Sequence, residues 1–167
     1  GNFYRIDPDL TVTKIRSKYR IPNGLAWNPD NSVMYHTDTR TNVVRSYKFD
    51  LASGECMVER KFYLFDRDKT GGVDGAAMDI KGGYWAALYG GRKLIRVSPV
   101  GNLDAEIFLP VSQPTMPAFG GPDLKTMFIT SAYQNLDNGD FMSQPFAGGL
   151  LAISVNVQGH HVYPFRG

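Results

Sequence analysis

The sequence has few cysteines, no dense basic cluster and no long apolar run, which argues against three classes of protein. It contains one cysteine, Cys56, so it can form neither an intramolecular disulfide nor a cysteine-based zinc site. Its net charge of +2, without a dense cluster of lysine and arginine, argues against a nucleic-acid-binding surface. No apolar run approaches the roughly 18 residues of a membrane span. We therefore expect neither nucleic-acid nor membrane partners, and the sparse cysteine fits a cytoplasmic protein.

Amphipathic helical periodicity is also missing from the sequence. What is present instead is a series of short segments in which apolar and polar residues alternate, separated by glycine, proline, asparagine and aspartate. This pattern is typical of β-strands joined by tight turns. The 167 residues suit one domain, and a hydrophobic content of 43% is ordinary for a globular protein. The sequence thus predicts an all-β fold.

A unit of four strands recurs along the chain. It opens with a glycine-containing segment, at 23–27, at 74–78 and more weakly at 117–120. A tight turn, an aromatic-rich strand, a third strand and a more polar fourth strand follow, and in the last unit the fourth strand is expected at 161–165. Four-strand units that repeat every roughly 40–50 residues favour a β-propeller over a β-sandwich, which also joins short strands by turns.

The predicted propeller is incomplete. Residues 1–20 match only the third and fourth strands of the unit, and complete units are expected at 21–70, 71–112 and 113–167. The chain would then supply about three and a half blades, whereas propellers close their ring with roughly four to eight. We expect it to be the C-terminal part of a longer protein, or a piece completed by a second chain or a second copy.

Two oxygen-bearing side chains occupy equivalent positions in the first two complete units. Asn23 stands directly before Gly24, and Asp74 stands directly before Gly75. Equivalent residues of a propeller can face one axis, and amide and carboxylate oxygens suit Ca²⁺, Mg²⁺ or Mn²⁺ and could admit Zn²⁺ or Fe²⁺. The pattern predicts a divalent-cation site. The alternative is that both pairs only form turns, for which asparagine, aspartate and glycine are favoured.

Several segments in a characteristic order carry a resemblance to a known family. This order resembles the regucalcin (senescence marker protein), gluconolactonase and luciferin-regenerating enzyme family over the whole chain. The segments are IPNGLAW at 21–27, VDG at 73–75, LYGGR at 88–92, FGG at 119–121 and GGLLAI at 148–153.

The resemblance implies a six-bladed propeller with a divalent cation in its central channel. In that family the cation is held by a glutamate near the N-terminus, by the asparagine of the Asn-Gly motif and by the aspartate of the Asp-Gly motif. The last two map onto Asn23 and Asp74. The glutamate, and the arginine and asparagine that hold substrate, belong to N-terminal blades that this chain lacks. Val73 stands where many relatives have proline.

The activity implied by the resemblance is metal-dependent hydrolysis of sugar lactones. The cation, with calcium expected first, would polarise the lactone carbonyl, and Asp74 would be both a ligand and the general base. Tyr89 and Ser131 end corresponding strands of the next two units, so we expect them to contact the substrate. The rival hypothesis is a non-catalytic half-propeller that acts as an interaction or self-assembly module.

Other polar residues are expected to serve the fold. His36 stands in an aromatic strand and is predicted to be packed rather than to bind metal. Asp38 and Thr39 are predicted to form a turn or a hydrogen bond between blades. The acidic stretch 137–140 lacks the remaining positions of a calcium loop and is predicted to be a polar loop. Cys56 is predicted to be a small apolar filler.

Overall fold

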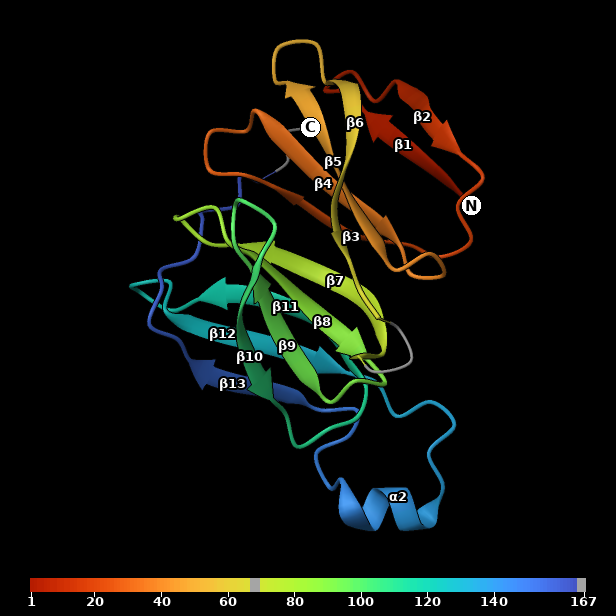
Figure 1. The fold of residues 1–167 in the computed structure, drawn as a ribbon, viewed down its shortest axis with the longest axis vertical. Helices are drawn as coiled ribbons and strands as arrows, with labels where there is room; N and C mark the ends of the chain where they lie inside the picture. The colour runs from red at the N-terminus through yellow and green to blue at the C-terminus, as the bar shows by residue number, and fades with distance from the viewer. Residues whose placement is uncertain (67–69, 165–167) are drawn as a thin grey trace.

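The computed structural model describes residues 1–66 and 70–164 (Figure 1). The strands are antiparallel and form four sheets, so the all-β prediction is confirmed. The first two sheets contain β1 (Asn2–Ile6) and β2 (Val12–Ser17), then β3 (Pro22–Trp27), β4 (Val33–Asp38), β5 (Val43–Asp50) and β6 (Glu55–Leu64). The other two contain β7 (Gly72–Met78), β8 (Tyr84–Tyr89), β9 (Lys93–Val97) and β10 (Leu103–Phe108), then β11 (Pro114–Gly120), β12 (Thr126–Ser131) and β13 (Leu150–Ser154).

Burial changes from strand to strand within a sheet in a way that the sequence explains. The second strands β4 and β8 are buried along almost their whole length. β8 is a continuous run of apolar and aromatic residues, whereas β4 also buries the polar residues His36, Thr37 and Asp38. The outer strands β2 and β10 alternate between exposed and half-buried residues, as their mixed sequences predict. A strand buried on both faces must lie between two neighbouring sheets. The sheets therefore pack face to face, with the second strands in the interior.

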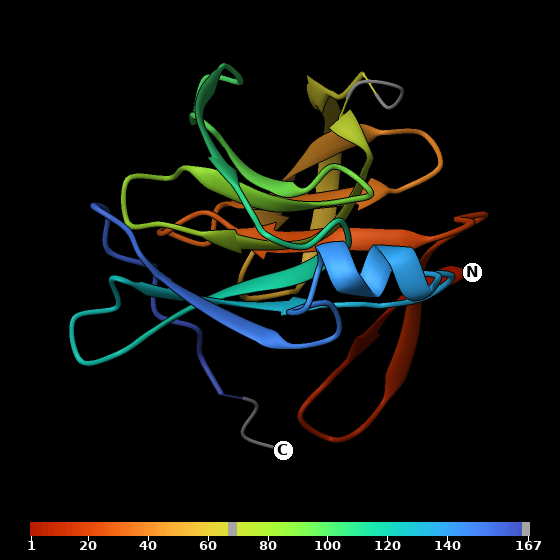
Figure 2. The same cartoon turned by 90° about the horizontal axis from the view of Figure 1, so that it is seen from below.

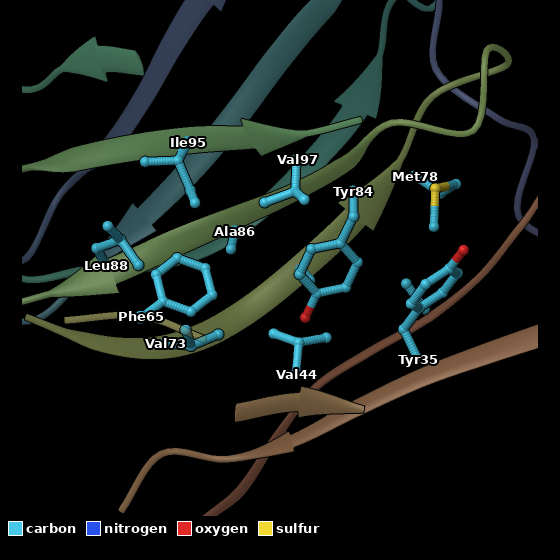
Figure 3. Packing of buried hydrophobic residues seen from close by; sticks show 12 residues of the cluster. Tyr35, Val44, Phe65, Val73, Met78, Tyr84, Ala86, Leu88, Ile95 and Val97 are labelled. Atoms are coloured by element: carbon cyan, nitrogen blue, oxygen red, sulfur yellow. The ribbon is translucent and has the colours of Figure 1, made fainter. Parts of the chain in front are cut away.

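The first core cluster lies between the β3–β6 sheet and the β7–β10 sheet. Alternate side chains of β8, namely Tyr84, Ala86 and Leu88, point into it because successive side chains of a strand face opposite sides. The Tyr84 hydroxyl donates a buried hydrogen bond of 2.8 Å to the carbonyl oxygen of Gly24 on β3. The side chains that meet them include Tyr35, Val44, Phe65, Val73, Met78, Ile95 and Val97 (Figure 3).

A second core cluster lies on the other face of β8. Trp85 and Ala87 point to this side, where they meet Met127 and Ile129 of β12. The β7–β10 sheet is thus covered by a neighbouring sheet on each face. This arrangement leaves the first strands of three successive sheets next to one another, since β3 contacts β7 and β7 contacts β11.

Glycine permits this close approach of the first strands. A side chain at Gly75 would place its Cβ 2.8 Å from the carbonyl oxygen of Thr115 on β11, closer than real contacts allow. Gly24 has a positive φ of 62°, and a Cβ there would collide with the Tyr84 hydroxyl. The glycines after Asn23 and Asp74 are therefore required by the packing of the sheets as well as by the local turn.

The last sheet differs from its prediction. A fourth strand was expected at 161–165, but residues 161–164 are irregular, and Phe165 lies outside the described residues. The chain before them bonds elsewhere, because Gly159 forms a bridge with Asp79 and the His160 N–H donates to the Met78 carbonyl over 2.9 Å. The strand expected from Pro117 also begins earlier, at Pro114, since the glycine signal at 119–120 marks its end.

The acidic stretch 137–140 contains a helix where a loop was predicted. Helix α2 (Asn138–Ser143) begins with a capping box, in which Asp137 accepts from the Asp140 N–H over 2.8 Å and Asp140 returns the bond. It has no buried residue and lies apart from the sheets at one end of the molecule (Figures 1 and 2). In the part of the chain that the structure describes, no helix has the length and apolar character needed to cross a membrane.

Candidate functional site

The candidate site lies where the first strands begin. In all three larger sheets, the residue that opens the first strand pairs with the residue that ends the second strand. The register shifts directly after this pair in β11 and one pair later in β3 and β7. Such a β-bulge bends the strand and redirects its side chains. Asn23 lies directly before the bulge of β3 and Asp74 lies within the bulge of β7, near the start of each strand. The opening pairs are Pro22 with Asp38, Gly72 with Tyr89, and Pro114 with Ser131.

A threonine links the two predicted metal ligands. The Nδ2 of Asn23 donates to the Oγ1 of Thr39 over 2.8 Å. The same Oγ1 lies 2.6 Å from the carbonyl oxygen of Val73, to which it donates. Because Val73 directly precedes Asp74, two hydrogen bonds connect the Asn23 amide to the backbone beside the Asp74 carboxylate. The structure therefore brings the Asn23 side chain close to the residue that precedes Asp74, although the two are far apart in sequence.

The carboxylate of Asp74 is half-buried and has no donor. Among the described residues, none donates a hydrogen bond to it or forms an ion pair with it. Burial raises the pKa of this carboxyl group above its ordinary value, and no opposing contact lowers it. A carboxylate withdrawn from water without a partner costs folding free energy, so such groups are found where a ligand completes them.

The free oxygen atoms suit a hard cation. The Oδ1 of Asn23 accepts no hydrogen bond from the described residues, and the Asp74 carboxylate likewise has no hydrogen-bond donor among them. Calcium takes roughly six to eight oxygen ligands, which may include water. Within residues 1–66 and 70–164, no group of three or more histidine, cysteine, aspartate or glutamate side chains could hold a metal. The oxygen atoms of Asn23 and Asp74 are of the chemical type that binds a divalent cation, and their role as ligands stays a prediction.

A separate cavity of about 690 Å³ lies on the C-terminal parts of β3, β7 and β11. Its walls are mainly apolar, with Trp27, Met78, Met116 and Phe119 among them, and they include neither Asn23 nor Asp74. The cavity and the two predicted metal ligands therefore lie at different ends of these strands. We assign the candidate site to the starts of the strands, because the two oxygen-bearing side chains of the Asx-Gly motifs lie there, whereas the cavity walls are mainly apolar.

Comparison with known proteins identifies the family. The sequence model of the SMP-30/gluconolactonase/LRE-like region matches residues 1–133. The chain belongs to this family. It is 37% identical to 6-deoxy-6-sulfogluconolactonase of Pseudomonas putida over 159 residues, which are 95% of this chain and 54% of that protein. It is 33% identical to regucalcin of Bos taurus over 169 residues, with 100% of this chain and 56% of that protein covered.

A solved structure of the same family has the same fold. Regucalcin from Agrobacterium tumefaciens, described as a calcium-binding protein, superposes with a TM-score of 0.92 at 29% identity. The match covers 99% of this chain and 56% of that one. The resemblance inferred from the sequence is thereby confirmed. The chain spans about half the length of the curated relatives that it matches.

Tyr89 and Ser131 lie at the same end of the sheets as the candidate site. Both are half-buried, and each pairs with the first residue of the neighbouring strand, as Asp38 does in the β3–β6 sheet. The Ser131 hydroxyl donates to the carbonyl of Gly149 over 2.9 Å and keeps its lone pairs free to accept. Contact with a substrate remains a prediction for both residues.

The sequence analysis missed Thr115. The bulge of β11 contains Thr115, near the start of the first strand of its sheet, and its hydroxyl oxygen lies 2.7 Å from that of Thr130. No Asx-Gly pair marks this position, so the motif did not reveal it. The available signal was its place at the start of the first strand of its unit.

The residues predicted to serve the fold do so. His36 is buried between the rings of Phe3 and Tyr19, at centroid distances of 5.2 and 4.6 Å, and burial lowers its pKa to about 4. Asp38 accepts backbone hydrogen bonds that hold the turn before β3, and Thr39 bridges two sheets. Cys56 is half-buried, and its sulfur lies 3.6 Å from that of Met34.

Proposed function

We propose that this chain carries part of the catalytic site of a metal-dependent hydrolase of sugar lactones. The observation that carries the proposal is the half-buried Asp74 carboxylate, which has no donor among the described residues. It directly follows Val73, whose carbonyl is linked through the Thr39 hydroxyl to the Asn23 amide. Family membership supports the substrate class, because the Pseudomonas putida relative is a sugar lactonase. A carboxylate at such a site has two possible uses, as a ligand and as a base.

The proposal includes a six-bladed β-propeller. Its support is the simple order of strands in each sheet and the adjacency of β3, β7 and β11, which would line the axis of the ring. In this arrangement residues 1–20 are half a blade, and 21–70, 71–112 and 113–167 are blades. The remaining blades would come from the part of the family's length that this chain does not span.

Asn23 Oδ1 and one Asp74 oxygen would hold the cation. Calcium is the first candidate because a relative is a calcium-binding protein, and Mg²⁺, Mn²⁺, Zn²⁺ and Fe²⁺ are the others to test. A bound divalent cation supplies Lewis acidity, which draws electron density from a lactone carbonyl. A third protein ligand, the glutamate implied by the family resemblance, would complete the site from outside this chain.

The second oxygen of Asp74 would act on water. As general base it accepts a proton from a water molecule, whose oxygen forms a bond to the lactone carbonyl carbon. The bond between that carbon and the ring oxygen then breaks, and Asp74 returns the proton to the ring oxygen, which leaves a hydroxy acid. Tyr89 and Ser131 would orient the sugar hydroxyls.

Lactone hydrolysis with and without divalent ions tests this proposal. The chain is titrated with each ion, and hydrolysis of gluconolactone is measured above the uncatalysed rate. Asp74→Asn keeps the shape but removes the base, so we expect kcat/KM to fall by about 10²–10⁴-fold. Asp123→Asn is the matched control, because Asp123 caps an exposed turn by accepting from the Lys125 N–H. Undiminished activity in Asp74→Asn would remove this residue from the mechanism.

The alternative is a non-catalytic half-propeller that assembles with a second chain or copy. It is favoured by the edge of β13, beside which the described residues place no further strand, and by Leu150 on β13, which is 66% exposed. Unpaired strand edges are sites for pairing with another chain. Light scattering separates the two functions. A stable dimer without lactonase activity would favour assembly, and a monomer at all concentrations would count against it.

A further inference from the structure

We propose that Thr39 is a positioning residue that fixes which way the Asn23 amide points. This inference rests on the proposed function, since it concerns the oxygen that Asn23 offers to a cation. The central observation is that one hydroxyl contacts both the Asn23 side chain, over 2.8 Å, and the carbonyl oxygen of Val73, over 2.6 Å.

Proton counting decides the direction of both hydrogen bonds. A threonine hydroxyl has one proton to donate and lone pairs with which to accept. The carbonyl of Val73 can only accept, so the Thr39 proton must go to it. The hydroxyl can then only accept from Asn23, which must present its NH₂ group. A flipped amide would bring Oδ1 against the Thr39 oxygen with no proton between the two acceptors, and a hydrogen bond would become a repulsion.

The consequence is a directed oxygen. With its NH₂ group held by Thr39, Asn23 turns Oδ1 away from Thr39, where no described residue donates to it. Without Thr39, the amide could rotate and present NH₂, which cannot bind a cation. Residues that orient a metal ligand in this way typically change metal affinity by about 10–100-fold when they are removed.

Thr39 is itself held in place. Its N–H donates to the carbonyl of Ile21 over 2.9 Å, which fixes the backbone. Its methyl group lies against Gly72, where a Cβ would come within 2.7 Å of it, so the side chain has little freedom to rotate. Thr39 thus joins the β3–β6 sheet to the β7–β10 sheet between the Asn23 side chain and the residue that precedes Asp74.

Three variants separate orientation from packing. Thr39→Val keeps the shape but removes the hydroxyl, and Thr39→Ser keeps the hydroxyl. Thr41→Val is the matched control, because its hydroxyl also donates to a backbone carbonyl, that of Asp38, over 2.9 Å. Calorimetric titration with Ca²⁺, and separately with Mn²⁺, measures ion affinity. The NMR signals of the Asn23 side-chain NH₂ group report its environment in ion-free protein.

We expect Thr39→Val to bind ions about 10–100-fold more weakly, while Thr39→Ser and Thr41→Val bind as the unchanged protein does. The Asn23 NH₂ signals should move in Thr39→Val only. If Thr39→Val does not fold, Thr39→Ser still tests the proposal. A large loss of ion affinity in Thr39→Ser, which keeps the hydroxyl, would contradict it.

The results distinguish this inference from the proposed function. If Asn23→Ala weakens ion binding but Thr39→Val does not, the positioning role is wrong and the cation site stands. If the unchanged chain binds neither ion, the cation site is wrong for this chain, and only the NMR comparison tests whether Thr39 orients the Asn23 amide. Asn23 signals that are the same in Thr39→Val would then overturn the inference, and a change confined to that variant would support it.

Discussion

Two aspartates at opposite ends of one strand behave in opposite ways. Asp79, directly after β7, is fully buried, and its oxygens accept from the Arg96 guanidinium over 2.6 and 3.2 Å. The Trp85 indole and the Gly83 N–H also donate to it, each over 2.9 Å. Burial works against ionisation, but these bonds outweigh it and the pKa of Asp79 is lowered. Asp74, near the start of β7, is only half-buried and has none of these donors.

The contrast shows that burial alone does not mark a functional carboxylate. The more deeply buried aspartate is the structural one, because every oxygen has a donor and a guanidinium balances its charge. Burial of the less buried aspartate destabilises its charged form, and no donor among the described residues offsets this. A cation or a water molecule could do so. Under the proposed function, the carboxylate that binds a ligand is the one without donors among the described residues and not the more deeply buried one, and the following measurements test that distinction.

The largest effect is expected when the partner of Asp79 is removed. Arg96→Met leaves a buried charge without its cation, so we expect the free energy of unfolding to fall by about 3–5 kcal/mol. Urea denaturation measures it. The control is Lys93→Met, which breaks a more exposed ion pair of 3.2 Å with Glu106 and should cost about 0–1 kcal/mol. Equal losses in the two variants would mean that the Asp79 cluster does not hold the fold.

The next effect concerns His36, which is buried without a charge. Its pKa is lowered from 6.5 to about 4, mainly by burial. Below pH 6.5 the unfolded chain takes up a proton that the folded protein refuses until about pH 4, so stability is lost as pH falls through this window. The loss amounts to about 3 kcal/mol. Denaturation measured at several pH values in this window should show that the free energy of unfolding depends less on pH in His36→Phe. An equally steep pH dependence in this variant would contradict the assignment.

A smaller effect is expected at the bond that anchors the strand of Asn23. Tyr84→Phe removes the donor to the buried Gly24 carbonyl and should lower the free energy of unfolding by about 1–2 kcal/mol. Tyr133→Phe is the control, because Tyr133 is 61% exposed. Thermal melts of both variants make the comparison. Identical melting temperatures would show that this hydroxyl does not help to hold the two sheets together.

The smallest effect on stability is expected at Asp74 itself. Asp74→Asn removes a charge that has no donors, so the free energy of unfolding should change by less than about 1 kcal/mol or rise slightly. The same substitution at Asp79 replaces an acceptor of several hydrogen bonds and should cost several times more. Parallel urea titrations compare the pair. If Asp74→Asn lowers the free energy of unfolding as much as Asp79→Asn does, the two aspartates do not differ in their structural role.

The sequence by itself determined the class of fold and the place to look for chemistry. Alternating apolar residues predict strands because side-chain direction along a strand has a period of two, and this needs no knowledge of distant partners. The Asx-Gly pairs at Asn23 and Asp74 were visible for the same reason, since turn chemistry is local. The prediction of a packed His36 also followed from its aromatic neighbours in the chain.

Only the tertiary structure decided which polar groups are satisfied. Asp74 lies within β7 and Asp79 directly follows it, and nothing local shows that Arg96 contacts Asp79 whereas no cationic side chain in the described part of the chain contacts Asp74. The same holds for Thr39, whose role depends on a carbonyl in the next sheet, and for the segment after Gly159, which bonds to β7 instead of forming a fourth strand. Hydrogen bonds between sheets depend on how whole sheets pack, and this is set by contacts between residues far apart in sequence.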